Sequence, residues 1–303
     1  MGRDPRFLAW LAFASVSFFW GTTYLGIRMA LEGFPPMLLL ALRFLLSGGI
    51  LLIVAPVRGW TLPRGRELRE TALQGLMLLG VGNGCLVLAE TWIPSGMAAL
   101  IITLSPFWLV GLDAAFPGGE RLHGPTLAGM AVGLAGVGLL IGPDALSGGQ
   151  ASSLWKGLLI LQVGNLFWNL GSIYQRRRTV TVHAFSSGAV QQFTVGVVCL
   201  VIVLIWPGGE VHVTLRSSLA LAWLVVFGSI VGYTSYLYVL DHLPVAIVSL
   251  YNYINPVVAV LLGWWFYREP FGWREACGMM VIFAGVALVR RFQAKGAARR
   301  SGR

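Results

Sequence analysis

The chain has 303 residues, of which 56% are hydrophobic and only 11% are charged. An ordinary soluble domain carries about 25% charged residues, so this composition, with a mean hydropathy of +0.75, predicts a membrane protein. The formal net charge of +10 does not indicate nucleic-acid binding, because the basic residues lie in short links and at the chain ends.

Ten apolar stretches are long enough to cross the hydrocarbon of a bilayer, which needs about 20 mostly apolar residues per helix. In chain order they are residues 7–31, 35–57, 69–92, 94–116, 124–142, 152–175, 184–206, 217–241, 244–267 and 272–291. The links between them are too short to fold alone, so no ATPase domain is expected. The first stretch is longer than the apolar core of a cleaved signal peptide, about 7 to 15 residues, and is expected to remain.

The 22 Lys and Arg residues are predicted to lie mostly on one side of the membrane. With a cytoplasmic N-terminus, sixteen lie on the cytoplasmic side: Arg3, Arg6, Arg58, Arg64, Arg66, Arg69, Arg121, Arg176, Arg177, Arg178, Arg290, Arg291, Lys295, Arg299, Arg300 and Arg303. Three lie opposite: Arg216, Arg268 and Arg274. The positive-inside rule therefore predicts that both termini are cytoplasmic, with the basic tail near anionic lipid head groups.

The chain repeats itself after half its length. FFWGTTYLGIR at residues 18–28 resembles WNLGSIYQRRR at residues 168–178. At a shift of 150 positions, Gly21, Thr22, Tyr24, Arg28, Pro94 and Pro106 fall on Gly171, Ser172, Tyr174, Arg178, Pro244 and Pro256. We therefore expect two five-helix halves, residues 1–150 and 151–303. Because five is odd, the second half is inverted, which is a common transporter architecture.

Each half also has a proline in the middle of its fourth helix. Pro106 and Pro256 lack an N–H, so the carbonyls of Ile102 and Asn252 lose their usual helical donors. Such carbonyls are tolerated in a membrane where protein or a water-lined cavity satisfies them, so the prolines indicate a site, with a packing kink as the alternative. Elsewhere, the spacings Gly129 to Gly133 and Gly138 to Gly142 are typical of close helix packing.

Several motifs resemble the EamA-type branch of the drug/metabolite transporter superfamily, close to its YedA-like members. They are the segment WGTTYLGIRMALEGFPPMLLLALRFLLSGGILL, the run GVGNGCLVLAETWIPSGMAALI, the SP and NP positions, and the E-x8-G-x6-G endings of the fifth and tenth helices. The resemblance covers nearly the whole chain. It implies ten helices in two inverted repeats and small-molecule movement across a bacterial inner membrane, usually export of amino acids, other metabolites or drugs.

Polar residues concentrate at the midpoints of the predicted helices. Because a polar group in hydrocarbon is costly, such residues normally face the bundle interior or a cavity. The candidate substrate-binding residues are Trp20, Thr23, Tyr24, Asn83, Ser105, Asn165, Trp168, Ser172, Tyr233, Tyr251, Asn252 and Asn255. The structural alternative is that the tryptophans fill space and the asparagines make helix-to-helix hydrogen bonds.

Two ionisable residues fall in the half of the membrane away from the termini. Arg43 lies early in the second helix and Glu90 near the end of the third. An unpaired charge there is expensive, so we expect Arg43 and Glu90 to interact directly or through water, as a structural clamp or as a gate. Glu90 is also the carboxylate best placed for protonation, although an Arg partner would oppose that role.

No metal or cofactor site is predicted. Cys85, Cys199 and Cys277 all fall inside spans without metal-ligand spacing. The four histidines are dispersed: His123, His183, His212 and His242. Catalysis usually needs a positioned acid, base or metal cluster, so a polytopic membrane enzyme is the weaker interpretation.

The sequence thus predicts a secondary transporter, an exporter of small amphipathic metabolites such as amino acids, working by alternating access in a bacterial inner membrane. Its expected partners are a small-molecule substrate and the lipid bilayer, not nucleic acid. The alternative is efflux of drugs or organic cations by proton antiport, with cation–π contacts to the aromatic rings. Sugar phosphates are disfavoured, because the mid-span regions offer little positive charge beyond Arg43.

Overall fold

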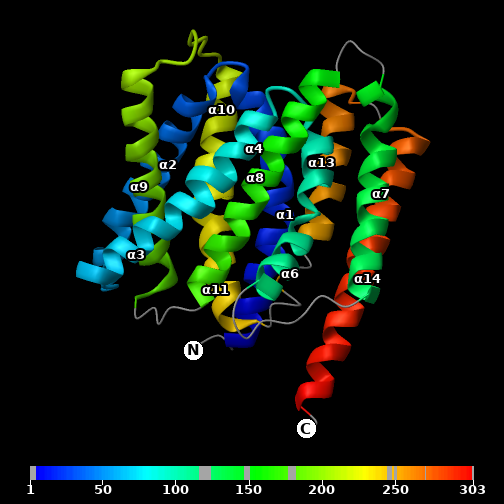
Figure 1. Ribbon diagram of the computed structural model, residues 1–303. Coiled ribbons are helices and arrows are strands. Elements are labelled where there is room, and N and C mark those ends of the chain that lie inside the picture. The colour runs from blue at the N-terminus through cyan, green and yellow to red at the C-terminus, as the bar shows by residue number, and fades with distance from the viewer. Residues whose placement is uncertain are drawn as a thin grey trace.

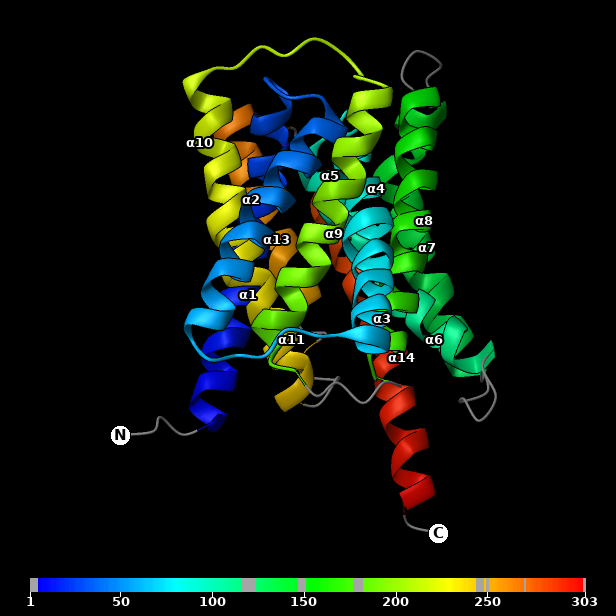
Figure 2. The ribbon, with the colours of Figure 1, turned by 90° about the vertical axis from the view of Figure 1, so that its left-hand side faces the viewer.

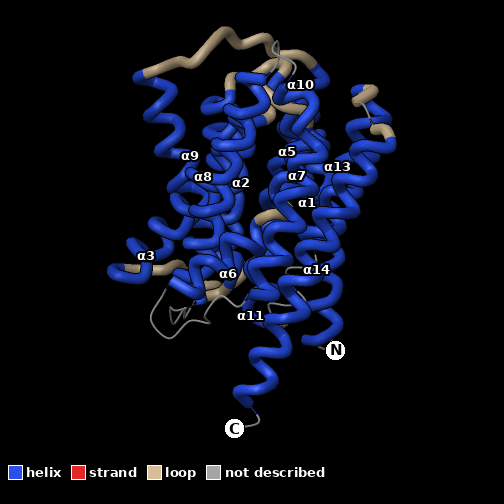
Figure 3. The backbone as a smooth tube through the Cα atoms, turned by 45° about the vertical axis from the view of Figure 1, so that its right-hand side comes forward, coloured by secondary structure: helices blue, strands red, loops and turns tan. Residues whose placement is uncertain are grey.

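The computed structural model describes residues 5–115, 124–146, 151–176, 182–243, 248, 251–269 and 271–301. These residues form an elongated bundle of helices (Figure 1). Within the described ranges the chain contains no strand (Figure 3). The prediction of an all-helical protein is confirmed for this part of the chain.

The first half contributes α1 (Pro5–Leu31), α2 (Pro36–Val57), α3 (Gly65–Gly75), η1 (Leu76–Asn83), α4 (Gly84–Ala89), α5 (Ser95–Ile102), α6 (Ser105–Ala115) and α7 (Gly124–Leu146). The second half contributes α8 (Ala151–Arg176), α9 (Ala184–Ile205), α10 (Leu215–Trp223), η2 (Leu224–Tyr233), α11 (Thr234–His242), α13 (Tyr251–Tyr267) and α14 (Trp273–Ser301).

Six described helical stretches are long enough and apolar enough to cross a membrane. They are Phe7–Leu31, Pro36–Val57, Gly65–Ala89, Ser95–Leu112, Ala184–Ile205 and Leu215–Leu240. A shorter apolar stretch covers Gly124–Leu139. The coarse prediction of a polytopic membrane protein agrees with these stretches. Part of the predicted ninth span, at residues 244–247, 249 and 250, lies outside the described residues.

Local sequence explains where several helices begin and end. Pro35 precedes α2 in extended backbone and Pro36 occupies its first position, where a missing N–H costs nothing. Thr214 and Ser217 form a capping box at the start of α10. Gly59, with φ of +74°, follows the end of α2, a conformation that glycine adopts without strain.

Two helical columns contain wide, π-helical turns in their middle. η1 continues α3 into α4, and η2 continues α10 into α11. At the 150-residue shift η1 overlaps η2, so the two halves of the chain carry this irregularity at corresponding places. π-helical turns are rare and frequently occur at functional sites. The sequence pattern gave no indication of them.

The two mid-span prolines act differently. Next to Pro106 the helix is interrupted, since α5 ends at Ile102 and α6 begins at Ser105. In the interruption, the Thr103 N–H donates to the Leu100 carbonyl at 3.2 Å. Pro256 instead lies inside the continuous helix α13. The equivalent motifs therefore give a broken helix in one half and an unbroken one in the other.

α1 begins and α14 ends at the same end of the bundle, and α14 projects beyond it (Figure 1). The link from α2 to α3, which contains Arg58 and Arg64, also lies at this end (Figure 2). The link from α9 to α10 lies at the opposite end (Figure 2). We refer to these as the terminal end and the far end.

Helices α7 and α14 pack along each other through glycines. A Cβ on Gly285 would lie 2.6 Å from the Cα of Gly133 and 2.7 Å from the carbonyl oxygen of Gly129. The predicted packing role of Gly129 and Gly133 agrees with this contact. The same prediction for Gly138 is wrong for the described part of the chain, where a Cβ on Gly138 would meet no atom within 4 Å. The contacts of Gly142, predicted together with Gly138, lie outside the described residues.

We expect Gly285→Ala to lower the free energy of unfolding by about 1 to 3 kcal/mol, because the methyl group would overpack a backbone contact. The matched control is Gly138→Ala, on the partner helix, which is expected to leave stability unchanged or raise it slightly through helix propensity. Thermal unfolding of both variants in detergent measures the difference. Equal melting temperatures would contradict close α7–α14 packing.

Candidate functional site

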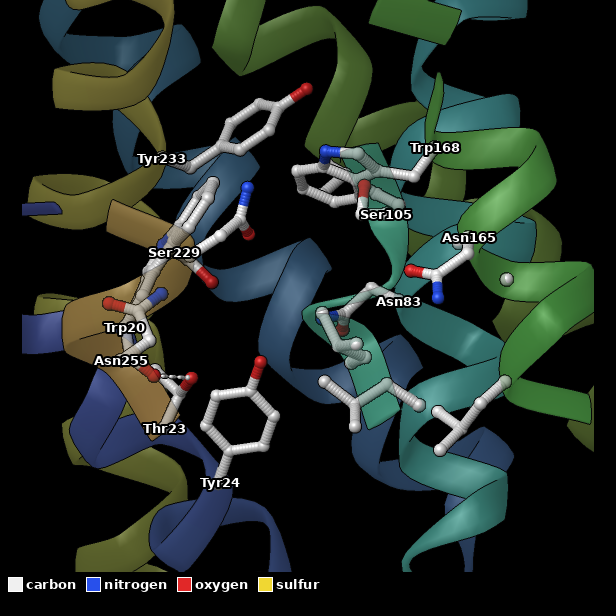
Figure 4. A pocket seen from close by; sticks show the side chains of 18 of the residues that line it. Trp20, Thr23, Tyr24, Asn83, Ser105, Asn165, Trp168, Ser229, Tyr233 and Asn255 are labelled. Carbon is white, nitrogen blue, oxygen red and sulfur yellow. Dashed lines mark hydrogen bonds between the residues drawn. The ribbon is translucent and has the colours of Figure 1, made fainter. Parts of the chain in front are cut away.

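A cavity lies between the helices in the middle of the bundle (Figure 4). It contains about 740 Å³ of space not occupied by protein atoms, including its opening. Twelve of the fourteen predicted site residues line it: Trp20, Thr23, Tyr24, Arg43, Asn83, Ser105, Asn165, Trp168, Tyr233, Tyr251, Asn252 and Asn255. The structure thus gathers residues from seven separate helical segments around one space.

Two predicted residues do not line the cavity. Ser172 is buried nearer the terminal end, where its hydroxyl donates to the Trp168 carbonyl at 2.8 Å and lies 3.3 Å from the Tyr236 hydroxyl. Glu90 is buried beyond the cavity toward the far end. Ser172 therefore supports the wall of the cavity rather than forming it.

The sequence analysis did not predict nine of the lining residues: Ser229, three glycines, and the apolar residues Phe44, Leu79, Leu86, Ile102 and Leu161. Ser229 lies in η2, and Gly82, Gly164 and Gly228 also face the cavity. Ser229 could have been predicted as a site residue, because it is a polar residue within an apolar run in the middle of a span. The glycines gave no such signal, because their role depends on which side chains approach them.

Five aromatic rings form one cluster on the side of the cavity toward the terminal end. The ring centroids of Trp20 lie 4.9 Å from Tyr236, 5.3 Å from Tyr251 and 5.6 Å from Trp168. Tyr233 is 6.5 Å from Trp20. Edge and offset ring contacts of this kind contribute about 0.5 to 1.5 kcal/mol each beyond area burial. The cluster offers flat apolar surfaces to a solute.

The position of the Trp20 side chain is fixed by ring contacts and by a hydrogen bond from its indole nitrogen. Its Nε1 donates to the Gly228 carbonyl at 3.1 Å, which ties α1 to η2. A Cβ on Gly232 would lie 2.7 Å from the same Nε1, so glycine is needed for the indole to reach this position.

Across the cavity from Trp20 lie the amides of Asn165 on α8 and Asn83 on η1, whereas Asn255 lies beside Trp20 (Figure 4). The Asn169 amide donates to the Ser105 hydroxyl at 2.8 Å, which joins α8 to the start of α6. Asn165, one turn away, has a buried amide nitrogen without a hydrogen-bond partner in the described part of the chain. An unsatisfied donor beside a cavity is available to an acceptor on a bound solute.

Asn255 packs against α1 from α13. With its amide nitrogen turned toward α1, it donates to the Ser17 carbonyl at 2.7 Å and to the Tyr251 carbonyl at 3.2 Å. The bond to Ser17 is a helix-to-helix hydrogen bond, which was the alternative to substrate binding for the asparagines. Asn255 also lines the cavity.

Arg43 reaches across the bundle and is only 4% exposed. Its Nε donates to the Ser229 hydroxyl at 2.8 Å and its Nη1 to the Asn83 amide oxygen at 3.3 Å. A Cβ on Gly228 would lie 2.9 Å from Nη2. Among the residues that the structure describes, both hydrogen-bond partners of this guanidinium are neutral.

Of the two predicted forms of the Arg43–Glu90 interaction, the direct hydrogen bond is not formed in the described part of the chain, whereas the two groups do interact electrostatically. The interaction through water stays a prediction. Both carboxylate oxygens of Glu90 are buried without a hydrogen-bond partner among the described residues. Glu90 follows directly after the end of α4, about two helical turns beyond Asn83, whereas Arg43 donates to Asn83 of η1 and Ser229 of η2. This axial offset accounts for the missing hydrogen bond, although Arg43 still acts on Glu90 through space.

A second carboxylate, Glu269, closes the far end of the bundle. It is 8% exposed, and its oxygens accept from the Ser95 N–H at 3.1 Å, the Ser95 hydroxyl at 2.9 Å and the Gly96 N–H at 3.0 Å. It also pairs with Arg28 of α1 at 3.2 Å. A carboxylate satisfying the first N–H groups of α5 is favoured by the helix dipole as well.

Buried amides on α9 connect the cavity wall to its surroundings. The Gln191 amide donates to Gln74 of α3 at 3.1 Å, and Tyr233 of η2 donates to Gln191. Gln192 donates to the Ser229 carbonyl at 3.4 Å and accepts from the Ser47 hydroxyl at 2.5 Å. This amide network joins α2, α3, α9 and η2.

Comparison with known proteins identifies one family. The model of the EamA-like transporter family matches residues 7–142 and again residues 155–291. The inner membrane transporter YedA of Escherichia coli (strain K12) is 37% identical over 274 residues, which are 89% of this chain and 86% of YedA. A Salmonella typhimurium protein named "Probable amino-acid metabolite efflux pump" is 28% identical, with all of both chains covered.

A crystal structure of another protein has the same fold, with a TM-score of 0.70 over 96% of this chain and 98% of that one. The two sequences are 23% identical, so this likeness concerns the fold alone.

We expect Glu269→Ala to destabilise the protein by about 3 kcal/mol, because it leaves Arg28 and the first N–H groups of α5 without their buried acceptor. Thermal unfolding in detergent measures the loss. Glu210→Ala, in the exposed far-end link, is the control and is expected to have no measurable effect. If the two variants melt alike, Glu269 does not hold the far end together.

Proposed function

Because the chain belongs to the EamA-like transporter family, we propose that it is a secondary transporter of the bacterial inner membrane. It exports small amphipathic metabolites such as amino acids by alternating access. The family and the named relatives support transport rather than enzymatic catalysis. The substrate is argued below from the cavity.

The observation that carries the proposed substrate class is the environment of Arg43. This buried cation faces the cavity, and its described hydrogen-bond partners, Ser229 and Asn83, are neutral. Guanidinium groups bind carboxylates strongly and often through two parallel hydrogen bonds. A solute that brings a carboxylate would supply the missing counter-charge, while Trp20 and Trp168 contact its apolar portion.

Efflux of organic cations is the second candidate, and the aromatic cluster favours it through cation–π attraction. Arg43 opposes it, because a cationic solute would enter a cavity that already holds an unneutralised positive charge. The name of the Salmonella relative, which refers to amino-acid efflux, also supports an amino acid rather than an organic cation as the solute.

We also propose the architecture of ten membrane helices in two inverted five-helix halves, residues 1–150 and 151–303. Two separate matches of one family model, one in each half, support the repeat. The overlap of η1 with η2 at the 150-residue shift supports it independently. Inverted halves around a central site are the usual basis of alternating access.

The proposed orientation places the terminal end in the cytoplasm, because the basic links and the basic tail lie there. In a Cys277→Ser background, we expect Val211→Cys in the far-end link to react with a membrane-impermeant maleimide in spheroplasts. Thr61→Cys in the terminal-end link should react only after permeabilisation. The reverse pattern would invert the orientation, and labelling of both sites from outside would contradict a spanning bundle.

Solute counterflow in proteoliposomes with a panel of amino acids tests the proposed function. We expect saturable exchange by the wild type. Trp20→Ala and Asn255→Ala should raise the half-saturation concentration about tenfold, since a lost contact of about 1.4 kcal/mol corresponds to that factor. Arg43→Gln should abolish the preference for an amino acid over the amine that lacks its carboxylate.

Trp265→Ala is the matched control for Trp20→Ala, because Trp265 is 72% exposed on the outer surface. It should exchange like the wild type. Exchange of amines but not of amino acids by the wild type would favour the organic-cation candidate, and equal losses in Trp20→Ala and Trp265→Ala would remove the cavity from the path.

A further inference from the structure

Glu90 is the buried carboxylate that the described structure leaves without a hydrogen-bond partner. It is 5% exposed, and neither of its oxygens accepts or donates a hydrogen bond within the described residues. Glu269, the neighbouring buried acid, has three hydrogen bonds and an ion pair. Two carboxyl groups at the same end of the bundle therefore have opposite environments.

The charged groups around Glu90 are already engaged elsewhere. Arg28 of α1 and Arg43 of α2 act on Glu90 through space, but Arg28 pairs with Glu269 and Arg43 donates to Ser229 and Asn83. The negative charge of Glu269 repels a second negative charge on Glu90. An ionised carboxylate in this position would lack both a counter-ion contact and a hydrogen bond, which is strongly unfavourable.

The other neighbours of Glu90 supply no alternative partner. Tyr24 of α1 lines the cavity and interacts electrostatically with Glu90, but no hydrogen bond joins the two side chains within the described residues. The described part of α5 contains no titratable residue. α8, which packs on α4, carries Lys156 toward the far end, and Lys156 is exposed.

We propose that Glu90 is a proton-binding site that couples solute movement to the proton gradient. This inference rests on the proposed transport function. In the conformation described here Glu90 holds a proton on one carboxylate oxygen and is neutral, which suits a buried acid without partners.

The position of Glu90 explains how the proton would move. Leu86, one helical turn before it on α4, lines the cavity, so opening the cavity brings water close to the carboxyl group. Once water reaches Glu90, the nearby Arg28 and Arg43 stabilise the ionised form. The proton passes to water on the side that is open, and a proton from the opposite side replaces it after the bundle reverses, one proton per cycle.

Infrared spectroscopy of the reconstituted protein tests the protonated state without any solute. We expect wild type at neutral pH to show the C=O stretch of a protonated carboxyl group, and this band to be missing in Glu90→Gln. Glu269→Gln, which changes a buried but ion-paired acid, is the matched control and should keep the band. A band that persists unchanged in Glu90→Gln, or no band in wild type, would overturn the proposal.

Stability provides a second measurement. Because Gln resembles a protonated Glu, we expect Glu90→Gln to melt at the wild-type temperature below about pH 4, where the unfolded chain also keeps this proton. At neutral pH we expect Glu90→Gln to melt above wild type, because wild type must hold on Glu90 a proton that the unfolded chain releases. A lower melting temperature at neutral pH would indicate that Glu90 is an ionised partner of arginine, which contradicts the proposal.

Transport separates this inference from the proposed function. With any amino acid that wild type exchanges, Glu90→Gln should retain counterflow, which needs no net proton movement, and should lose accumulation driven by a pH gradient. Wild-type counterflow without a response to the gradient would overturn proton coupling and leave transport intact. If wild type exchanges no panel member, the proposed substrate class fails, and the infrared band still decides whether Glu90 carries a proton.

Discussion

A membrane interior offers little water, so polar side chains inside the bundle need partners within the protein or beside a cavity. The bonds from Arg43 to Ser229 and Asn83 meet this requirement between α2, η1 and η2. The amides of α9 extend the same connections to α3. These bonds connect walls of the central cavity that belong to different helices.

Close approach of helices makes these bonds possible. Gly48 of α2 lies against the backbone of Phe193 of α9, and Gly196 of α9 lies against Leu45 of α2. Around the cavity the glycines have another effect, since Gly228 and Gly232 leave room for Arg43 and Trp20. The wide turns of η1 and η2 occur in these same walls, where a regular helix would direct different side chains inward.

The cavity has chemically different closures toward its two ends. Toward the terminal end, the rings of Trp20, Tyr236 and Tyr251 pack against one another. Toward the far end, Glu269 ties Arg28 to the start of α5. In the proposed transport cycle these two closures would open in turn, and Glu90 interacts electrostatically with Glu269 and Arg28 of the ionic one. Aromatic contacts separate without exposing charge, whereas opening the ionic closure needs water to replace the partners of Arg28 and Glu269.

The amino-acid sequence by itself determined that the chain lies in a membrane, which segments are apolar enough to cross it, and which polar residues meet inside. Those properties depend on local composition and spacing, and eleven of the twelve predicted substrate-binding residues do line one cavity. Only the tertiary structure decided the partners. Arg43 bonds to Ser229 rather than Glu90, and the chain breaks near Pro106 but not at Pro256. The reason is physical: a partner across helices depends on their axial offset and rotation, which are set by packing between segments far apart in the chain.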